Sequence, residues 1–232
     1  MKRYRINEQQ PLKTKRLLLT PMNEAELSEY LEHTADGFTR SAFAEMRRCV
    51  VGYPDQALWY TSWRVSLRGT GEPVGYLGFH GMPEDKTVRL GFEVLEQHRG
   101  NGYAGEAVKA LCDWAFSREN AYFIQVMADE SNAAANHVLE VLKFYRIESP
   151  IEGQRFWELE RPASAWMAVY LSLGLCLGLA LGGSVFDSQT LGISIGMCTG
   201  LALGLTMDSQ DRTARKREKE PKKLDAQEKE KK

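Results

Sequence analysis

The order of apolar and polar residues divides the chain into an amphipathic part and a nearly uncharged part. Up to about residue 164, apolar and polar positions alternate in short blocks; from 165 to 207, Asp187 alone carries a charge. The last segment, 208–232, is rich in Lys and Glu. The pattern therefore predicts a folded domain over 1–164, a pair of apolar helices over 165–207, and a solvated, disordered tail over 208–232.

Within the first segment, short periodic blocks predict a mixed α/β domain. The clearest strand is 87–95, where apolar and polar residues alternate. The clearest helix begins near Ala104, with apolar residues recurring at steps of three and four. The other expected elements are strands at 15–21, 59–67, 73–81, 122–128 and 155–160, and helices at 24–31 and 132–143.

The segment that joins this strand to this helix, QHRGNGYA at 97–104, carries the strongest chemical signal. Gly100 and Gly102 let the backbone turn tightly and let its amides approach a ligand. The amides of the first helical turn and the helix dipole favour an anion there, and Arg99 adds a cation. The segment therefore predicts a phosphate or pyrophosphate site; the alternative is an ordinary glycine turn between strand and helix.

The same residues also spell G-x-G-x-x-G, with Gly100, Gly102 and Gly105. In a dinucleotide-binding fold, Asp129 after the next strand would contact the ribose. That fold needs several further parallel strands, and only about twenty residues of the first segment follow Tyr145. The architecture therefore argues against nucleotide binding, which remains the alternative function because of the glycine spacing and Asp129.

Several stretches resemble the GNAT family of N-acetyltransferases, in the branch similar to enzymes that acetylate ribosomal-protein N-termini. Residues 97–102 match the family's pyrophosphate loop, Q/R-x-x-G-x-G/A; residues 14–19 resemble its opening strand, 91–94 its fourth strand, and 129–132 with 138–144 its late helix. The likeness covers about residues 12–166. It implies a mixed, mostly antiparallel twisted sheet flanked by helices, and acetyl transfer from acetyl-CoA to a primary amine, either a protein N-terminus or a small molecule.

The resemblance also implies roles for individual residues. Val94 and Leu95 would receive the pantetheine arm, and Asn132 would lie near the cofactor, although a plain helix cap explains Asn132 equally well. Glu93, on the polar face of the strand, is the candidate general base, and its alternative is a solvent-facing carboxylate. Glu106 is either a supporting residue or an ordinary first-turn acid. The residues expected around the pyrophosphate are Gln97, Arg99, Gly100, Asn101, Gly102, Tyr103 and Ala104.

Three positions depart from the family pattern. Ala135 stands where this branch often has serine, Lys143 where the family has glycine, and Leu139 where other members have a tyrosine that protonates the thiolate. A catalytically weak or inert scaffold on a membrane assembly module is therefore an alternative function.

Glycines recur every four residues in both apolar stretches. Gly174, Gly178 and Gly182 form one stripe, and Gly192, Gly196, Gly200 and Gly204 form the other. Such stripes let helices approach closely in lipid, so we expect a two-pass membrane hairpin in contact with lipid. A homo-oligomer through the stripes is a further hypothesis. A buried soluble hairpin is the alternative. Lys and Arg flank the hairpin and avoid its turn, which predicts both ends in the cytoplasm.

Composition narrows the partners. The chain has 30 Lys and Arg against 31 Asp and Glu, so no charge excess points to nucleic acid. The four cysteines and four histidines show no metal-ligand or disulfide spacing. The basic, polar N-terminus shows no apolar signal sequence, so we expect a cytoplasmic domain. Because no metal-ligand spacing is present, we expect no metal. The acceptor amine is not specified by any of these features.

Overall fold

The computed structural model describes residues 11–33, 37–118, 120–163, 165–184 and 188–217. The chain forms two compact units that divide between Arg161 and Pro162. Each unit is described by itself below.

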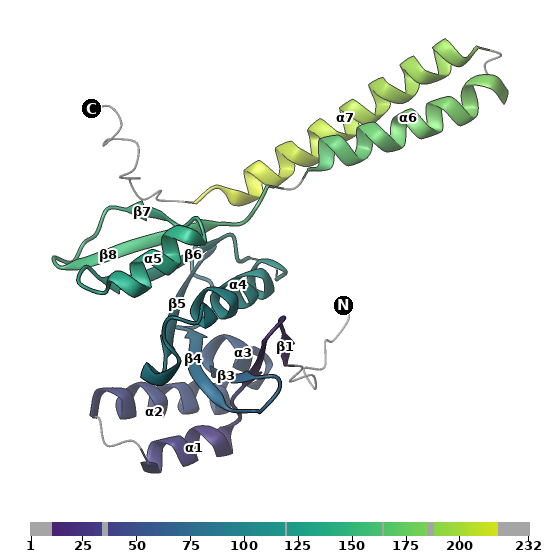
Figure 1. The fold of residues 1–232 in the computed structure, drawn as a ribbon. Coiled ribbons are helices and arrows are strands. Elements are labelled where there is room, and N and C mark those ends of the chain that lie inside the picture. The colour runs from purple at the N-terminus through teal and green to yellow at the C-terminus, as the bar shows by residue number, and fades with distance from the viewer. Residues whose placement is uncertain (1–10, 34–36, 119, 164, 185–187, 218–232) are drawn as a thin grey trace. The chain divides into compact units, whose positions relative to one another are not determined.

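The first unit is built on an eight-stranded sheet in the order β1-β2-β3-β4-β5-β6-β8-β7 (Figure 1). Neighbouring strands are antiparallel, except that β5 and β6 are parallel. This architecture is the mixed, mostly antiparallel sheet that the sequence predicts. The strands are β1 (Leu12–Lys13), β2 (Leu17–Pro21), β3 (Ser62–Leu67), β4 (Pro73–Phe79), β5 (Thr87–Val94), β6 (Phe123–Asp129), β7 (Tyr145–Ile147) and β8 (Gln154–Glu160).

Helices cover both faces of this sheet. On one face, α4 (Tyr103–Phe116) buries the apolar stripe recognised in its sequence and packs with Trp63, Leu77 and Phe79 in the main core. On the other face, a smaller core joins Leu27 and Phe43 to the half-buried Tyr76 of β4. The remaining helices are α1 (Glu24–His33), α2 (Gly37–Gly52), α3 (Ala57–Tyr60) and α5 (Ala133–Val141), with short 3-10 turns at Pro54–Gln56 and Glu96–His98.

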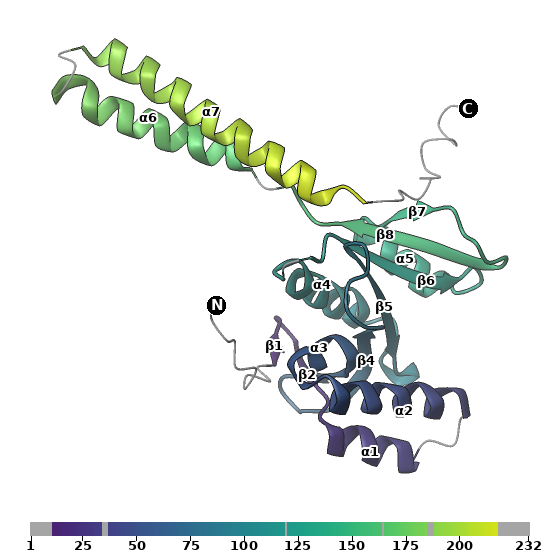
Figure 2. The ribbon, with the colours of Figure 1, turned by 180° about the vertical axis from the view of Figure 1, so that it is seen from behind.

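Strands β5 and β6 separate along their length. They pair only from Thr87 to Arg89 on β5 and from Phe123 to Gln125 on β6. Beyond these residues, β5 continues on β4 as far as Val94, and β6 continues on β8 as far as Asp129. One edge of β5 therefore lacks a strand partner from Leu90 to Val94, and the sheet opens there. Figure 2 shows the two strands from behind.

The first unit differs from the sequence prediction at α3 and α2, and in the short strands β1 and β7, which were not predicted. Residues 57–60 form α3 instead of the start of a strand, because Trp59 and the half-buried Tyr60 reach the core from a helical turn. The sequence also did not predict α2, a helix of 16 residues. Of the α2 side chains whose burial is described, only Phe43 is buried, so its apolar stripe is too narrow to give a clear helical period.

The second unit is a hairpin of α6 (Trp166–Ser184) and α7 (Gln189–Arg215). Both helices are long and apolar enough to cross a membrane, with mean hydropathies of 1.7 and 1.5 over the tested spans. At 1.5 Å per residue, the 19 residues of α6 extend about 28 Å, which matches a bilayer's hydrocarbon core. Helix α7 continues to Arg215, so the tail expected to be disordered from residue 208 begins as helix.

The two glycine stripes face each other inside the hairpin. A Cβ atom added to Gly196 would lie 2.1 Å from the carbonyl oxygen of Gly174, and one added to Gly178 would lie 2.4 Å from that of Gly192. The helices are therefore in backbone contact, as the spacing predicts. Because each stripe is covered by the other, neither is exposed to a second copy. The suggested homo-oligomer through these stripes would require the hairpin to open, and we do not propose it.

At the end of the hairpin away from its turn, Arg215 connects the C-terminus of α7 to the segment before α6. The Arg215 guanidinium lies 2.8 Å from a carboxylate oxygen of Asp211 and donates a 2.8 Å hydrogen bond to the carbonyl of Pro162. This contact ties the last turn of α7 to the segment that leads into α6.

We expect Gly196→Leu to force the two helices apart. No side chain fits at this position without moving the Gly174 backbone, so the axes should move toward the roughly 8–10 Å separation of helices that pack through larger side chains. Spin labels on the exposed Cys176 and Cys198, with Cys49 replaced by serine, would report the change as a longer distance. Gly183→Leu is the matched control, since its Cβ meets nothing within 4 Å. Equal distances in both variants would contradict the close packing.

Candidate functional site

A cavity of about 950 Å³ lies where β5 and β6 separate. Its walls come from the end of β5, the turn before α4, and the first turns of α4 and α5. The cavity therefore brings together segments that are about forty residues apart in the chain. Eight of the eleven residues proposed for the site line it: Glu93, Val94, Arg99, Gly100, Gly102, Tyr103, Ala104 and Asn132.

The turn before α4 presents unpaired backbone amides. Gly100 and Gly102 have φ angles of +80° and +74°, which only glycine adopts without strain, and Gly102 is the N-cap of α4. Among the described residues, none accepts a hydrogen bond from the amides of residues 100–105. Free amides at a helix N-terminus favour a bound anion, so this turn fits a phosphate or pyrophosphate group.

Thr14 and Arg16, between β1 and β2, hold this turn in place by binding Glu106. The Glu106 carboxylate accepts hydrogen bonds from the Thr14 hydroxyl at 2.6 Å and from the Arg16 Nε at 2.7 Å. Burial raises the pKa of the Glu106 carboxyl, but these hydrogen bonds outweigh burial, so its pKa lies below the usual value. Arg16 also donates to the Asn101 carbonyl at 3.0 Å and lies over the Tyr103 ring at 4.8 Å.

Thr14 and Arg16 are residues that the sequence prediction missed. They are about ninety residues away from Glu106 in the sequence, and no local sequence pattern predicts such a contact. Glu106 itself was recognised, and of its two interpretations the supporting role matches the contacts.

Glu93 lines the cavity and has an exposed side chain. It is the cross-strand partner of Tyr76, whose neighbour on β3 is Arg64. Burial raises the pKa of the Tyr76 hydroxyl, and the nearby Tyr30 and the Glu93 charge raise it further. Tyr30 contacts the Tyr76 ring edge-on at 5.4 Å. Glu93 thus faces the side of the sheet that α1 and α2 cover, next to the cavity.

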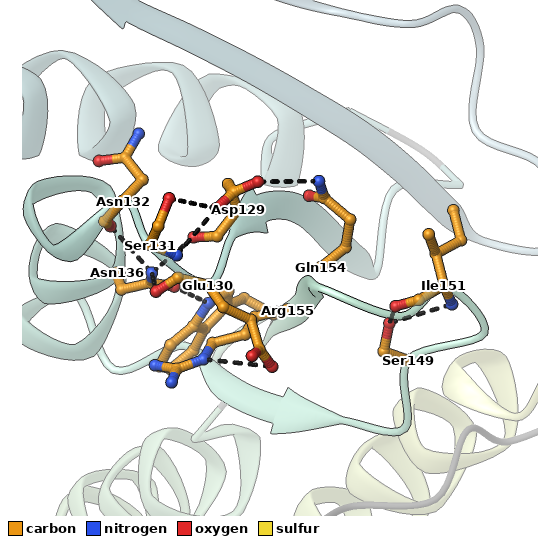
Figure 3. A network of polar contacts seen from close by, with 10 residues as sticks. Asp129, Glu130, Ser131, Asn132, Asn136, Ser149, Ile151, Gln154 and Arg155 are labelled. Atoms are coloured by element: carbon orange, nitrogen blue, oxygen red, sulfur yellow. Dashed lines mark hydrogen bonds and ion pairs between the residues drawn. The ribbon is translucent and has the colours of Figure 1, made fainter.

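The N-terminus of α5 is fixed by a polar network (Figure 3). The Asn132 side chain caps the helix by accepting a 3.0 Å hydrogen bond from the Ala135 amide. The buried Asn136 donates to the carbonyls of Asp129 and Asn132 at 2.9 and 2.8 Å, and accepts from the Trp157 indole at 2.9 Å. The network binds α5 to β6 and β8, so Asn132 is both a cap and a cavity residue.

Asp129, the acid of the nucleotide-binding interpretation, takes part in the same network. Its carboxylate accepts hydrogen bonds from the side chain and amide of Ser131 and from Gln154, which lower its pKa. Among the described strands, only β5 and β6 pair in parallel, so the doubly wound sheet of a dinucleotide-binding domain is not formed. That interpretation of the fold is wrong.

Three proposed site residues do not line the cavity. Leu95 has both backbone groups engaged, since its amide donates to Val74 at 2.9 Å and its carbonyl accepts from His98 at 2.9 Å. The Asn101 side chain donates to the His98 carbonyl at 3.1 Å and so shapes the turn. Gln97 is exposed. Cofactor contacts by Leu95, Asn101 and Gln97 stay predictions.

The cavity also contains residues that the sequence prediction passed over. His98 and His137 add two titratable rings to its walls, and Ser131 adds a hydroxyl. The histidines were examined only as metal ligands. In the described part of the chain, no three His, Cys, Asp or Glu side chains gather as a metal site.

The departures from the family pattern occupy different environments. Ala135 lines the cavity, whereas Leu139 is completely buried in the core. Lys143 is exposed and has a φ of +64°, and it follows Leu142, the C-cap of α5. This left-handed conformation is the physical reason for a glycine at that position.

We expect Lys143→Gly to leave the fold intact and to raise the free energy of unfolding by up to about 1 kcal/mol. A non-glycine residue in this conformation costs about 1–2 kcal/mol, and the greater entropy of an unfolded glycine offsets part of the gain. Thermal unfolding of the full chain in detergent would measure the change. Lys109→Gly, at an exposed position inside α4, should instead destabilise by about 1 kcal/mol. A loss of stability at residue 143 would contradict this explanation.

Comparison with known proteins gives two family matches. Residues 16–145 match the family described as Acetyltransferase (GNAT) domain, and residues 162–210 match the family described as Glycine zipper membrane protein. Two uncharacterized N-acetyltransferases of Bacillus subtilis are similar in sequence: YjdG is 34% identical over 86 residues and YoaA is 27% identical over 85. These alignments cover 37% and 36% of this chain, and 51% and 48% of the relatives. The chain thus spans about half the length of the curated relatives it matches.

Solved structures share the fold of the first unit. An acetyltransferase from Agrobacterium tumefaciens has a TM-score of 0.51 at 23% identity, over 65% of this chain and 94% of that chain. RimL, a ribosomal-protein alpha-N-acetyltransferase solved in complex with coenzyme A, has a TM-score of 0.52 at 16% identity, over 66% and 99%. At these identities the likeness establishes the fold and nothing finer.

Proposed function

Because more than half of this chain matches the GNAT acetyltransferase family, to which it therefore belongs, we propose that it transfers an acetyl group from acetyl-CoA to a primary amine. We place this reaction at the cytoplasmic face of the membrane that holds its C-terminal hairpin. The observation that carries the proposal is the cavity between the separated ends of β5 and β6, with free amides at its mouth.

The geometry suits the parts of acetyl-CoA in order. The amides of residues 100–105 and the Arg99 guanidinium would hold the pyrophosphate. The free edge of β5 from Leu90 to Val94 would take the extended pantetheine arm, as a sheet edge takes an added strand. The Arg99 Nε already donates to the Val94 carbonyl at 3.2 Å, so Arg99 would move when the arm binds there.

The thioester of acetyl-CoA supplies an electrophilic carbonyl carbon and a thiolate leaving group. An amine must lose a proton before it can attack, and Glu93 is the carboxylate placed at the cavity to accept that proton, directly or through water. The first turn of α5, fixed by Asn132 and Asn136, forms the opposite wall and holds the reacting groups in one orientation. The result is an amide and free coenzyme A.

A scaffold without turnover is the second candidate function. It is favoured by Leu139, because the completely buried side chain leaves no hydroxyl at the position where other family members have their tyrosine. The same side chain packs in the main core.

Thiol release from acetyl-CoA, measured with the full chain in detergent, would separate the two functions. The acceptors to test are peptides with a free N-terminus, polyamines and small primary amines. Amine-dependent release with at least one acceptor class is the expected result. Acetyl-CoA binding without release for any acceptor would favour the scaffold, and no binding would contradict the site itself.

Membrane attachment has its own test. The exposed surface of the hairpin is apolar over most of its length, with side chains such as Val169, Leu177, Leu191 and Leu203 facing outward. The protein should therefore stay in the membrane fraction after carbonate washing, because the apolar hairpin and not surface charge would hold it there. A cysteine at Ser188 should react with a membrane-impermeant reagent from outside, and one at Ser209 should not. Labelling of both only from inside would favour a re-entrant hairpin.

A further inference from the structure

The face of β5 that carries Glu93 also receives an imidazole from the neighbouring strand. Gly91 lies two residues before Glu93, and a Cβ atom added to it would lie 3.1 Å from the Nε2 atom of His80. His80 directly follows β4, and its amide donates a 3.0 Å hydrogen bond to the carbonyl of Arg89 on β5. The His80 ring therefore occupies the space that a side chain at position 91 would take.

His80 and Glu93 lie on the same side of the sheet. Leu90 and Phe92 pack with the main core below α4, so the alternate positions 91 and 93 point to the opposite face. Alternate positions along a strand are about 6.7 Å apart. A substrate nitrogen between the two groups can contact both, because a hydrogen bond spans about 3 Å. Within the described part of the chain, neither ring nitrogen of His80 makes a hydrogen bond, so Nε2 can accept one from a substrate.

Amide formation from an ammonium removes two protons from the acceptor nitrogen. The first must leave before the nitrogen attacks the thioester carbon, and in the proposed function Glu93 accepts it. The second leaves when the C–N bond has formed. A base for this second proton has to lie beside the same stretch of β5, because the thioester would be held along its free edge from Leu90 to Val94.

We propose that His80 accepts the second proton of the acceptor nitrogen at its Nε2 atom. The proposal rests on the acetyl transfer proposed above and adds a second catalytic residue to it. As the C–S bond breaks, its electron pair leaves with sulfur as the coenzyme A thiolate, and the nitrogen proton moves to Nε2. His80 remains partly exposed, so it can pass this proton to solvent after each turnover.

The surroundings of His80 favour the neutral imidazole, which is the form that accepts a proton. Burial of the ring lowers the pKa of His80, although the residue remains partly exposed, and the positive charge of Arg89 lowers this pKa further. Other titratable and charged groups lie on the segments around His80: Glu93 on β5, Tyr76 on β4, Tyr30 on α1, Tyr60 on α3, and Glu84, Asp85 and Lys86 in the turn before β5.

The test measures thiol release by the full chain in detergent as a function of pH, with acetyl-CoA and an amine at saturation. His80→Gln keeps a hydrogen-bonding side chain but cannot accept the proton, so turnover at neutral pH should fall by at least about 10²-fold. The affinity for acetyl-CoA, measured by calorimetry, should stay close to that of the native protein.

Arg89→Gln is the matched variant, because it keeps His80 and removes the charge that lowers its pKa. Its turnover at high pH should equal that of the native protein, and the loss of turnover on acidification should begin at a higher pH. In the double variant with His80→Gln, this shift should disappear.

Three results would overturn the role of His80 and leave the proposed acetyl transfer intact. The first is a native rate and pH profile in His80→Gln. The second is an unshifted profile in Arg89→Gln, which would make any effect of His80→Gln structural and does not depend on how that variant folds. The third is an equal shift with and without His80. Absence of amine-dependent thiol release by the native protein would instead overturn both proposals.

Discussion

Replacing Glu93 with glutamine should slow acetyl transfer by about 10²–10⁴-fold, the range that a general base supplies. Glutamine keeps the size and the hydrogen-bonding capacity of the side chain but cannot accept the proton of an ammonium. Because Glu93 lines the cavity and is proposed to act on the amine and not on the cofactor, the turnover rate should fall while acetyl-CoA affinity stays close to that of the native protein. Thiol release under saturating acetyl-CoA, combined with calorimetric binding, measures both quantities.

Glu96→Gln is the matched control for this substitution. Glu96 is an exposed carboxylate three residues further along and does not line the cavity, so its loss should leave the rate unchanged. Native turnover in Glu93→Gln across neutral pH would assign the proton transfer to water or to another group.

Replacing Gly102 with valine should abolish measurable acetyl-CoA binding. The new side chain would stand among the free amides of residues 100–105, where the phosphate oxygens would approach. Within the protein itself the added Cβ meets only the Arg16 guanidinium, at 3.6 Å, which is ordinary contact. The fold should therefore survive, at a cost of about 1–2 kcal/mol for a valine in the left-handed conformation.

Gly71→Val separates strain from ligand blockage. Gly71 lies in the turn between β3 and β4, has the same φ of +74°, and has nothing within 4 Å of an added Cβ. It should lose similar stability and keep its affinity for acetyl-CoA. If the two variants bind equally well by calorimetry, the pyrophosphate assignment to this turn is wrong.

The sequence predicted those parts of the fold in which local pattern and burial agree. The strict alternation of β5 and the wide apolar stripe of α4 each follow from a single periodicity, and both elements form where expected. The glycine turn between them was predicted for the same reason, since Gly100 and Gly102 stand immediately before the start of the helix. Helix α2 was missed because one buried phenylalanine does not make a period.

The candidate site was predictable mainly along one continuous stretch of chain. Seven of the eight proposed residues that line the cavity lie on the stretch from Glu93 to Ala104, and only Asn132 was proposed from a distant segment. Contacts between distant segments were not predictable: the hold of Thr14 and Arg16 on Glu106, and the anchoring of α5 by Asn136 and Trp157, depend on sheet order. Sheet order is set by long-range packing, which local sequence does not encode.

The direct glycine contact between α6 and α7 affects how the anchor can assemble. Gly178 meets Gly192, and Gly182 meets Gln189, so the contacts nearest the turn join residues that are close in sequence. Contacts of short sequence separation form quickly and need no partner chain. The hairpin can therefore close as a self-contained unit as soon as both helices are available. The acetyltransferase domain precedes the hairpin in the chain and leaves the ribosome first, so we expect it to fold before the hairpin closes.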